Sequence, residues 1–245
     1  MNLRTSLAIV VILVLGGNRL LVAGSDAIPA AGGEILITPV MHGSMQVEFG
    51  DIVIHVDPWS KGDYSAAPQA DLILVTDIHG DHLDPEAIGS LSREDTELVV
   101  SAAVAEQLGS GTVIANGESL EVAGVVVEAV PMYNLERGPE EGKLFHEKGR
   151  GNGYLLTLGG KRIYIAGDTA CIPEMQALQD IDVAFVPMNL PYTMPPEEAA
   201  ECVAAFKPAI VYPYHYRGSD LQVFQDRLAD AAEIEVRIRE WYPGS

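Results

Sequence analysis

The sequence predicts an α/β protein folded as a four-layer αββα sandwich, with two sheets packed together and helices outside each. Two observations point to this fold class: the chain opens with short strands, and strands then alternate with helices. With 245 residues, of which 48% are hydrophobic and 20% charged, the chain can bury a sizeable core. No linker-like stretch divides it, so we expect one domain after the N-terminal segment.

The first half of the chain is expected to begin with an antiparallel set and continue with alternating elements. The opening strands are Glu34–Thr38, Gln46–Phe49 and Asp51–Asp57, with Gly50-Asp51 as a hairpin turn. The apolar run in Asp71–Thr76 predicts a strand buried on both faces. The next elements are two short helices, Pro85–Ser90 and Ala102–Leu108, and two short strands, Glu97–Ser101 and Thr112–Ala115.

In the second half, two hairpins flank a long loop. The expected hairpins are Ser119–Val122 with Val125–Val130, around Ala123-Gly124, and Tyr154–Leu158 with Arg162–Ala166, around Gly159-Gly160. The loop Met132–Asn152 is rich in Gly, Glu and Lys, and it is long enough to be functional or mobile. The last elements are the strands Val183–Val186 and Ala209–Tyr212 and the helices Pro196–Phe206 and Asp220–Ala232.

The N-terminus has the pattern of a secretory signal peptide. Arg4 precedes Leu7–Leu15, an unbroken apolar run that is too short to span a bilayer of about 30 Å. Small residues follow, so cleavage after Gly24 or Ala27 is expected. An uncleaved anchor over Leu7–Ala23 is the alternative, which Asn18 and Arg19 would interrupt. The sequence thus predicts an exported protein, periplasmic or extracellular, with no stable membrane insertion after cleavage.

The predicted organisation is a signal peptide at residues 1–27 and one folded domain at residues 28–245. Removing the first segment leaves 13 basic and 34 acidic residues, a formal charge of −21. Such an acidic surface repels phosphate backbones, so nucleic acid is not an expected partner. Most of this charge is explained as a solubilising surface.

Only two cysteines are present, Cys171 and Cys202. An exported location would permit a disulfide, but two cysteines make no framework. Cys202 lies in the amphipathic pattern Pro196–Phe206 and is most simply interpreted as a small buried hydrophobe.

The richest cluster of metal-binding side chains follows the buried strand Asp71–Thr76. It contains Asp77, His79, Asp81 and His82 within six residues. Imidazole and carboxylate donors together suit Zn, Mn or Fe. The simple alternative is a solvated loop in which polar residues happen to cluster.

Other predicted strands also run into polar residues at their carboxyl ends. Open α/β sheets bind ligands beyond these ends, so the residues are expected to converge on one edge of a sheet. They are Asp168 after Arg162–Ala166, His215 after Ala209–Tyr212, Tyr133 and Asn134 after Val125–Val130, and Asn189 after Val183–Val186.

Together these motifs make the chain resemble the metallo-β-lactamase-fold hydrolase superfamily, from about residue 34 to residue 241. The family's hallmark is Thr-His-x-His-x-Asp-His, and Thr76–His82 matches it except at the first His. Gly167-Asp168-Thr169 and the late His215 match two further motifs of the family. The opening His42-Gly-Ser and Val56-Asp57-Pro58 resemble the branch that contains lactonases and phospholipase-D-like enzymes.

The resemblance implies a binuclear site for two divalent ions, with zinc expected and Mn or Fe as alternatives. The implied ligands are Asp77 and His79 for the first ion, Asp81, His82 and His215 for the second, and Asp168 as a bridge. A hydroxide held between the ions would be the nucleophile. Asp81 would also assist proton transfer.

The sequence departs from the family pattern at the first metal site. Asp77 replaces an imidazole with an anionic oxygen, which shifts preference toward Mn, Fe or Mg without excluding zinc. The family's third His is expected near Asn134, where none is found. His146 is either the substitute ligand or a solvated loop histidine, and Asn134 is the weaker alternative.

Further residues are expected around the metals rather than on them. His42 and Asp57 would lie at the rim or behind the ligands, where a carboxylate can orient a histidine. His55 lies mid-strand and is expected to be structural. Residues expected to line the pocket or meet the substrate are Tyr133, Asn134, Asn189, Tyr192, Tyr214 and Arg217.

These expectations predict a metal-dependent hydrolase that acts on a small molecule through an ester, lactone, amide or phosphodiester bond. Two alternatives remain open at this point. One is a non-catalytic metal-binding protein, suggested by the altered first site. The other is a di-iron redox enzyme on the same scaffold.

Overall fold

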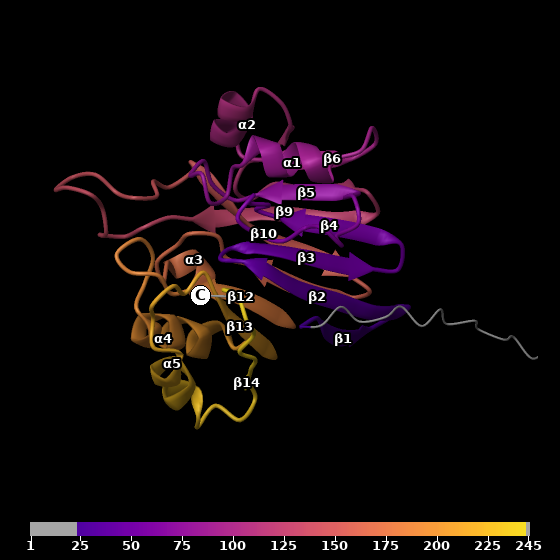
Figure 1. The fold of residues 1–245 in the computed structure, drawn as a ribbon. Helices are drawn as coiled ribbons and strands as arrows, with labels where there is room; N and C mark the ends of the chain where they lie inside the picture. The colour runs from indigo at the N-terminus through magenta and orange to yellow at the C-terminus, as the bar shows by residue number, and fades with distance from the viewer. Residues whose placement is uncertain (1–23, 244–245) are drawn as a thin grey trace, which may run out of the picture.

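A computed structural model describes residues 24–243, and it has the four layers that the sequence predicts. Two seven-stranded sheets face each other, with α1 and α2 on one outer side and α3 to α5 on the other (Figure 1). The largest apolar cluster lies between the sheets, and two smaller clusters lie beneath the two helical layers.

The first sheet begins antiparallel and ends parallel. Its first four strands form a meander in which β3 and β4 are joined at Gly50-Asp51, as predicted. From β4 onward its pairs are parallel. In spatial order its strands are β1 (Asp26–Ala30), β2 (Gly33–Met41), β3 (Ser44–Phe49), β4 (Ile52–Val56), β5 (Leu72–Val75), β6 (Glu97–Val100) and β7 (Thr112–Val113).

The second sheet repeats this plan. Strands β8 to β11 are antiparallel, and β11 to β14 are parallel. In chain order its strands are β8 (Ser119–Val122), β9 (Val125–Met132), β10 (Gly151–Leu158), β11 (Lys161–Ile165), β12 (Val183–Pro187), β13 (Ile210–Tyr214) and β14 (Glu235–Val236).

Five helices cover the outer faces of the described chain. Asp84 caps the first helix by accepting from the backbone N–H of Glu86 and Ala87, a typical N-cap arrangement. The helices are α1 (Pro85–Leu91), α2 (Ala102–Leu108), α3 (Pro173–Gln176), α4 (Pro196–Phe206) and α5 (Leu221–Leu228). None of the described helices has the length and apolarity needed to cross a bilayer.

Strand β1 was not predicted and crosses the predicted domain boundary at residue 28. It pairs with β2 along its whole length. The side chain of Asp26 accepts from Tyr212 at 2.5 Å and from Arg239 at 2.7 Å, and so ties β1 to the second sheet. The folded domain therefore begins at least as early as Asp26. The predicted signal peptide otherwise lies outside the described residues.

Several predicted boundaries also shift. Met132 ends β9 and Gly151 begins β10, so the long loop covers residues 133–150. The last helix stops at Leu228 rather than Ala232. The short elements α3 and β14 carry too few residues to show a periodic pattern, and the sequence did not predict them.

Candidate metal centre

The sequence motif after β5 forms a turn at the edge of the first sheet. The backbone N–H groups of His82 and Leu83 both donate to the carbonyl oxygen of His79, at 2.9 and 2.8 Å. This turn buries Asp77 and His82 completely, whereas the His79 side chain keeps 43% of its surface exposed. The motif therefore places some potential metal-binding side chains in the interior and His79 at the surface.

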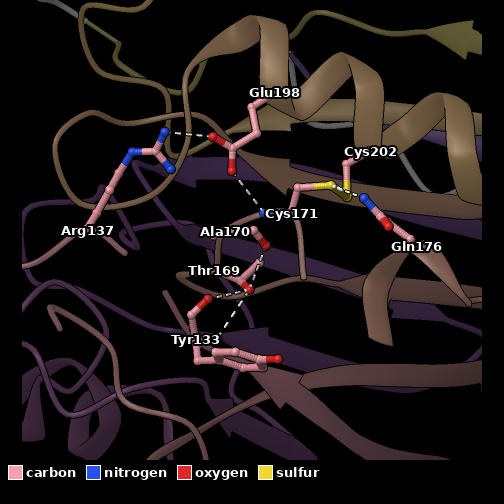
Figure 2. The surroundings of a disulfide bond; sticks show 8 residues. All are labelled: Tyr133, Arg137, Thr169, Ala170, Cys171, Gln176, Glu198 and Cys202. Atoms are coloured by element: carbon pink, nitrogen blue, oxygen red, sulfur yellow. Dashed lines mark hydrogen bonds and ion pairs between the residues drawn. A yellow bond between two sulfur atoms is a disulfide. The ribbon is translucent and has the colours of Figure 1, made fainter. Parts of the chain in front are cut away.

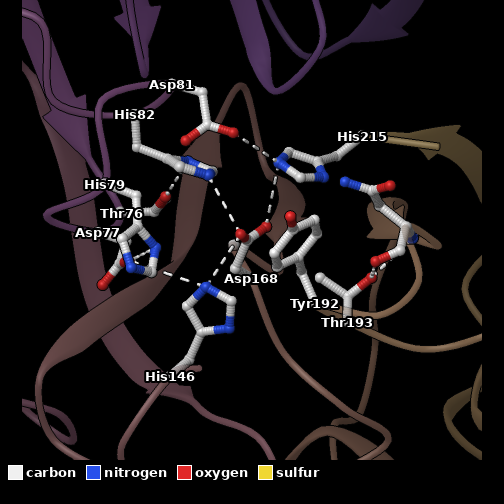
Figure 3. A network of polar contacts seen from close by, with 12 residues as sticks. Thr76, Asp77, His79, Asp81, His82, His146, Asp168, Tyr192, Thr193 and His215 are labelled. Carbon is white, nitrogen blue, oxygen red and sulfur yellow. Dashed lines mark hydrogen bonds and ion pairs between the residues drawn. The ribbon is translucent and has the colours of Figure 1, made fainter. Parts of the chain in front are cut away.

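Two clusters of metal-binding side chains meet at this edge. The atoms that could bind a metal lie within 4.8 Å of one another in each cluster. The first cluster is Asp77, His79 and His146, and the second is His82, Asp168 and His215. Figure 3 shows both clusters converging on the carboxylate of Asp168. A third combination, His42, Asp81 and His215, shares His215 with the second cluster.

Asp168 lies between the two clusters. Its Oδ2 is 3.1 Å from Nε2 of His146 and 3.3 Å from Nε2 of His82. Its Oδ1 is 3.4 Å from Nε2 of His215. Because this one carboxylate contacts His146 of the first cluster and His82 and His215 of the second, it is suited to bridge two cations.

The donor atoms of these clusters fit bound metal ions. Nε2 of His82, His146 and His215 and Oδ1 of Asp168 are buried without a hydrogen-bond partner among the described residues. Buried polar atoms are normally satisfied, so four such atoms directed at one place require an explanation. Divalent cations bound by lone pairs of imidazole and carboxylate supply it.

His82 is held in place by a carboxylate behind it. Its Nδ1 donates to Oδ2 of Asp57 at 2.8 Å, so Nε2, which lies 3.3 Å from Oδ2 of Asp168, is the ring atom that would bind a metal. Asp57 also accepts from the backbone N–H and hydroxyl of Thr76, at 2.7 and 2.6 Å. Asp57 therefore contacts His82 through Nδ1, the ring nitrogen other than the one near Asp168.

Three residues around the site have left-handed backbone conformations, which non-glycine residues adopt rarely. The φ angles are 58° for His42, 44° for Asp57 and 48° for His215. Such conformations cost on the order of 1–3 kcal/mol each and cluster at functional sites. His42, Asp57 and His215 directly follow β2, β4 and β13, so each strained conformation directs a side chain toward the site at a cost in stability.

His146 enters the site from the long loop, and Asn134 orients it. Oδ1 of Asn134 accepts from the backbone N–H of His146 and from its Nδ1, both at 2.8 Å. The amide of Asn134 donates to the carbonyl oxygen of Tyr192 at 2.7 Å. Because both ends of the Asn134 side chain are occupied, His146 is the better candidate ligand of the two.

A hydrogen-bonded chain also fixes Asp81 at the rim. Nε2 of His42 lies 3.2 Å from Oδ2 of Asp81, and the Tyr242 hydroxyl lies 2.6 Å from Nδ1 of His42. Burial and the charge of His215 lower the pKa of His42 to about 4, so it is a neutral ring that donates to Asp81. Burial would raise the pKa of Asp81, but its contacts with His215 and His42 lower it. Asp81 is therefore a carboxylate at neutral pH.

The buried ligands carry opposed charges. Burial alone would lower the pKa of His82, yet the carboxylates of Asp168 and Asp57 raise it well above the ordinary value. Burial alone would raise the pKa of Asp168, yet the charges of His215, His82 and His146 hold it well below the ordinary value. The centre is thus anionic at Asp168, and metal binding would release a proton from His82.

Arg150 is a further participant that no sequence motif indicated. Its guanidinium forms two parallel hydrogen bonds to Asp77, from Nε to Oδ1 at 3.1 Å and from Nη2 to Oδ2 at 2.9 Å. Asp77 also lies 2.8 Å from Nδ1 of His79. Arg150 immediately precedes β10, where no motif distinguishes it from any other loop arginine.

The turn that carries Asp168 is anchored to helix α4 (Figure 2). Cys171 and Cys202 form a disulfide, and the backbone N–H of Cys171 donates to Glu198 at 3.2 Å. Cys202 is buried in the apolar cluster beneath α4, as predicted, and the disulfide is a further contact that the sequence only permitted. Gly167 makes the turn with φ of 65°, and a Cβ there would lie 2.6 Å from Sδ of Met132. Local geometry and the crosslink together fix Asp168.

The other predicted pocket residues are placed less centrally. The Tyr133 hydroxyl donates to Glu174 on α3 at 2.9 Å. Tyr214 is fully buried and accepts from the backbone N–H of Gly167 at 2.9 Å, so it supports the Asp168 turn from beneath rather than lining a pocket. The backbone N–H of Asn189 donates to Thr193, and the backbone N–H of Arg217 donates to Tyr242. Tyr192 is 45% exposed and lies beside the clusters in Figure 3. His55, which was expected to be structural, contacts the carbonyl oxygen of Pro68.

Comparison with known proteins agrees with this geometry. The family described as a β-lactamase superfamily domain matches residues 36–215, which include every residue of both clusters. The chain belongs to the metallo-β-lactamase superfamily. A UPF0173 metal-dependent hydrolase of Thermococcus onnurineus is 33% identical over 202 residues, which are 75% of this chain and 88% of that relative. This chain is accordingly a metal-dependent hydrolase.

Solved structures extend the likeness to three dimensions. A crystal structure from Parabacteroides distasonis is 43% identical with a TM-score of 0.84, and the match covers 89% of this hydrolase and 99% of that chain. Igni18, a metallo hydrolase from Ignicoccus hospitalis, is 24% identical with a TM-score of 0.71, covering 84% and 95% of the two chains. At that identity the second likeness concerns the fold alone.

Proposed function

We propose that this hydrolase uses two divalent ions to cleave an ester, lactone, amide or phosphodiester bond in a small molecule. The first ion would be held by Asp77, His79 and His146, and the second by His82 and His215 with Asp81 at its rim. Asp168 would bridge the two. Zinc is the expected metal, because imidazole nitrogens predominate among the donors.

The observation that carries this proposal is the set of buried nitrogen and oxygen atoms around Asp168 that have no hydrogen-bond partner among the described residues. Three imidazole Nε2 atoms and one carboxylate oxygen are buried there without hydrogen-bond partners among the described residues. Asp57 and Asn134 fix two of these rings from behind, so the site is preorganised for cations.

The residues at the rim supply the proton transfers that hydrolysis needs. When bound, divalent ions supply Lewis acidity and activate water near neutral pH. The Asp81 carboxylate has 31% of its side-chain surface exposed, so it is accessible to relay a proton to the leaving group. His42 holds Asp81 in position through its 3.2 Å contact.

Metal analysis with a substrate panel tests this function. The purified protein should contain two metal equivalents and hydrolyse at least one member of a set of chromogenic esters, lactones, amides and phosphodiesters. Activity should vanish with a chelator and return with zinc. Two bound ions without hydrolysis of any class would indicate a non-catalytic metal-binding protein, and a visible iron chromophore would indicate a redox enzyme.

We further propose that the protein is exported and that its signal peptide is cleaved after Gly24. Cleavage after Ala27 would remove Asp26, whose carboxylate accepts hydrogen bonds from Tyr212 and Arg239. The disulfide is also typical of an oxidising compartment. N-terminal sequencing of the secreted protein should therefore begin at Ser25. A start at Ile28, or a protein that retains Met1, would contradict this.

A further inference from the structure

Arg150 is a permanent cation inside the first metal cluster. Its guanidinium binds both oxygens of Asp77, which is fully buried, and keeps 20% of its own side-chain surface exposed. Its backbone is fixed as well, because its carbonyl oxygen accepts from the hydroxyl of Ser101 at 2.7 Å. A guanidinium is not deprotonated in proteins, so this charge persists whenever a metal ion approaches.

The pairing has two consequences for charge. The Asp77–Arg150 pair is neutral as a whole. In this respect it resembles the neutral His that the family motif has at the position of Asp77. Asp77 therefore gives the first cluster little net attraction for a cation. The guanidinium, in hydrogen-bond contact with the same carboxylate, also repels a divalent ion placed on it.

Among the described residues, no guanidinium or ammonium group forms a hydrogen bond or ion pair with the second cluster. The side chains that contact His82, Asp168 and His215 are carboxylates, imidazoles and the Thr76 hydroxyl. An ion held there would meet the full charge of Asp168 and the nearby charge of Asp81. The two clusters are thus electrostatically unequal although they share Asp168.

We propose that Arg150 sets the relative metal affinity of the two sites. It weakens the site of Asp77, His79 and His146, so that this ion is the exchangeable one. The ion held by His82 and His215 is retained. This inference rests on the two-ion centre proposed above, and it assigns Arg150 a positioning and charge-setting role rather than a catalytic one.

Calorimetric titration of the metal-free natural protein with zinc should resolve one tight and one weaker binding event. Arg150→Gln removes the cation and leaves Asp77 as an unpaired anion, so the weaker event should tighten by about tenfold or more. Arg150→Lys keeps the charge and should stay within about threefold of the natural protein. The tight event should change little in either variant.

Arg93→Gln is the matched control, because Arg93 pairs with Asp71 at the opposite end of β5. Both of its binding events should be unchanged. If Arg150→Gln does not fold, Asp77→His/Arg150→Gln replaces the pair with the family's neutral ligand and should also tighten the weaker event.

A weaker event that loosens or stays constant in Arg150→Gln would overturn the inference, as would two equally tight events in the natural protein. Absence of any zinc binding would instead refute the proposed two-ion function. The titration thus separates the failure of one proposal from the failure of the other.

Discussion

Asp57→Asn is the most informative single change at this centre, because it alters one charge and almost no volume. Oδ2 of Asp57 faces two donors, the Thr76 hydroxyl at 2.6 Å and Nδ1 of His82 at 2.8 Å, while Oδ1 accepts from the Thr76 backbone. An asparagine has only one acceptor oxygen, so it can accept either from the Thr76 backbone or from the Thr76 hydroxyl and His82, but not from both sets. Its NH₂ group must face either the backbone N–H of Thr76 or the N–H of His82.

The consequence for metal binding is a tautomer conflict. If the NH₂ group faces His82, then Nδ1 must become an acceptor and the proton moves to Nε2, which can no longer bind a metal. Restoring the binding tautomer leaves a buried donor without an acceptor, which costs about 1–3 kcal/mol. At about 1.4 kcal/mol per factor of ten, zinc affinity at the second site should fall by roughly 10- to 100-fold.

Competition with a fluorescent zinc chelator measures this affinity directly. Asp71→Asn is the matched control, since Asp71 accepts from the backbone N–H of Val53 at 2.7 Å at the far end of β5. The control should lose stability on thermal unfolding but keep its zinc affinity. An Asp57→Asn variant whose zinc affinity stays within about twofold of the natural protein would refute the orienting role of Asp57.

Three further predictions follow from the same contacts. Asp168→Asn should weaken both ions together in a zinc titration, because its carboxylate contacts His146 of the first cluster and His82 and His215 of the second; loss of one ion alone would contradict a bridge. His146→Ala should lower the metal content, measured by plasma mass spectrometry, toward one ion. Asn134→Ala should keep both ions but bind them about tenfold more weakly in a zinc titration. For Asp26, burial raises the pKa, but the bonds from Tyr212 and the charges of two arginines lower it below the unfolded value. The stabilisation that ionised Asp26 gives the folded protein is therefore full above about pH 4 and is lost as pH falls through the folded pKa. The melting temperatures of metal-free Asp26→Asn and of the metal-free natural protein should accordingly differ at pH 7 and converge in acid. An equal gap at both pH values would rule this out.

The strand ends could be predicted from sequence because parallel strands leave a strong local signal. The apolar run before Asp77 and the motif around Asp168 each mark a buried strand that ends in polar residues. Side chains beyond such ends meet at one edge whatever the details of packing. The candidate ligands, the two sheets and the layer order could be predicted for this reason.

The supporting contacts could not be predicted, because they join residues far apart in the sequence. Arg150 meets Asp77 across 73 positions, and Tyr242 meets His42 across 200. Asn134 was weighed as a ligand, whereas the structure shows both ends of its side chain engaged by His146 and Tyr192. No periodicity or motif encodes such pairs, since they depend on how the two sheets stack.

Strand β1 escaped prediction for a different reason. Asp26–Ala30 directly follows an apolar segment with small residues, so a cleavage pattern and a strand overlap there. The pairing with β2 and the bonds from Tyr212 and Arg239 reveal that Asp26 belongs to the fold.

Anomalous diffraction from crystals of the zinc-loaded protein tests the central claim most directly. The account predicts two zinc peaks at the edge of the sheets, on either side of Asp168, one bound by His82 and His215 and the other by His79 and His146. The peak near His146 should have the lower occupancy at limiting zinc. The absence of any zinc peak in contact with Asp168 would contradict the account.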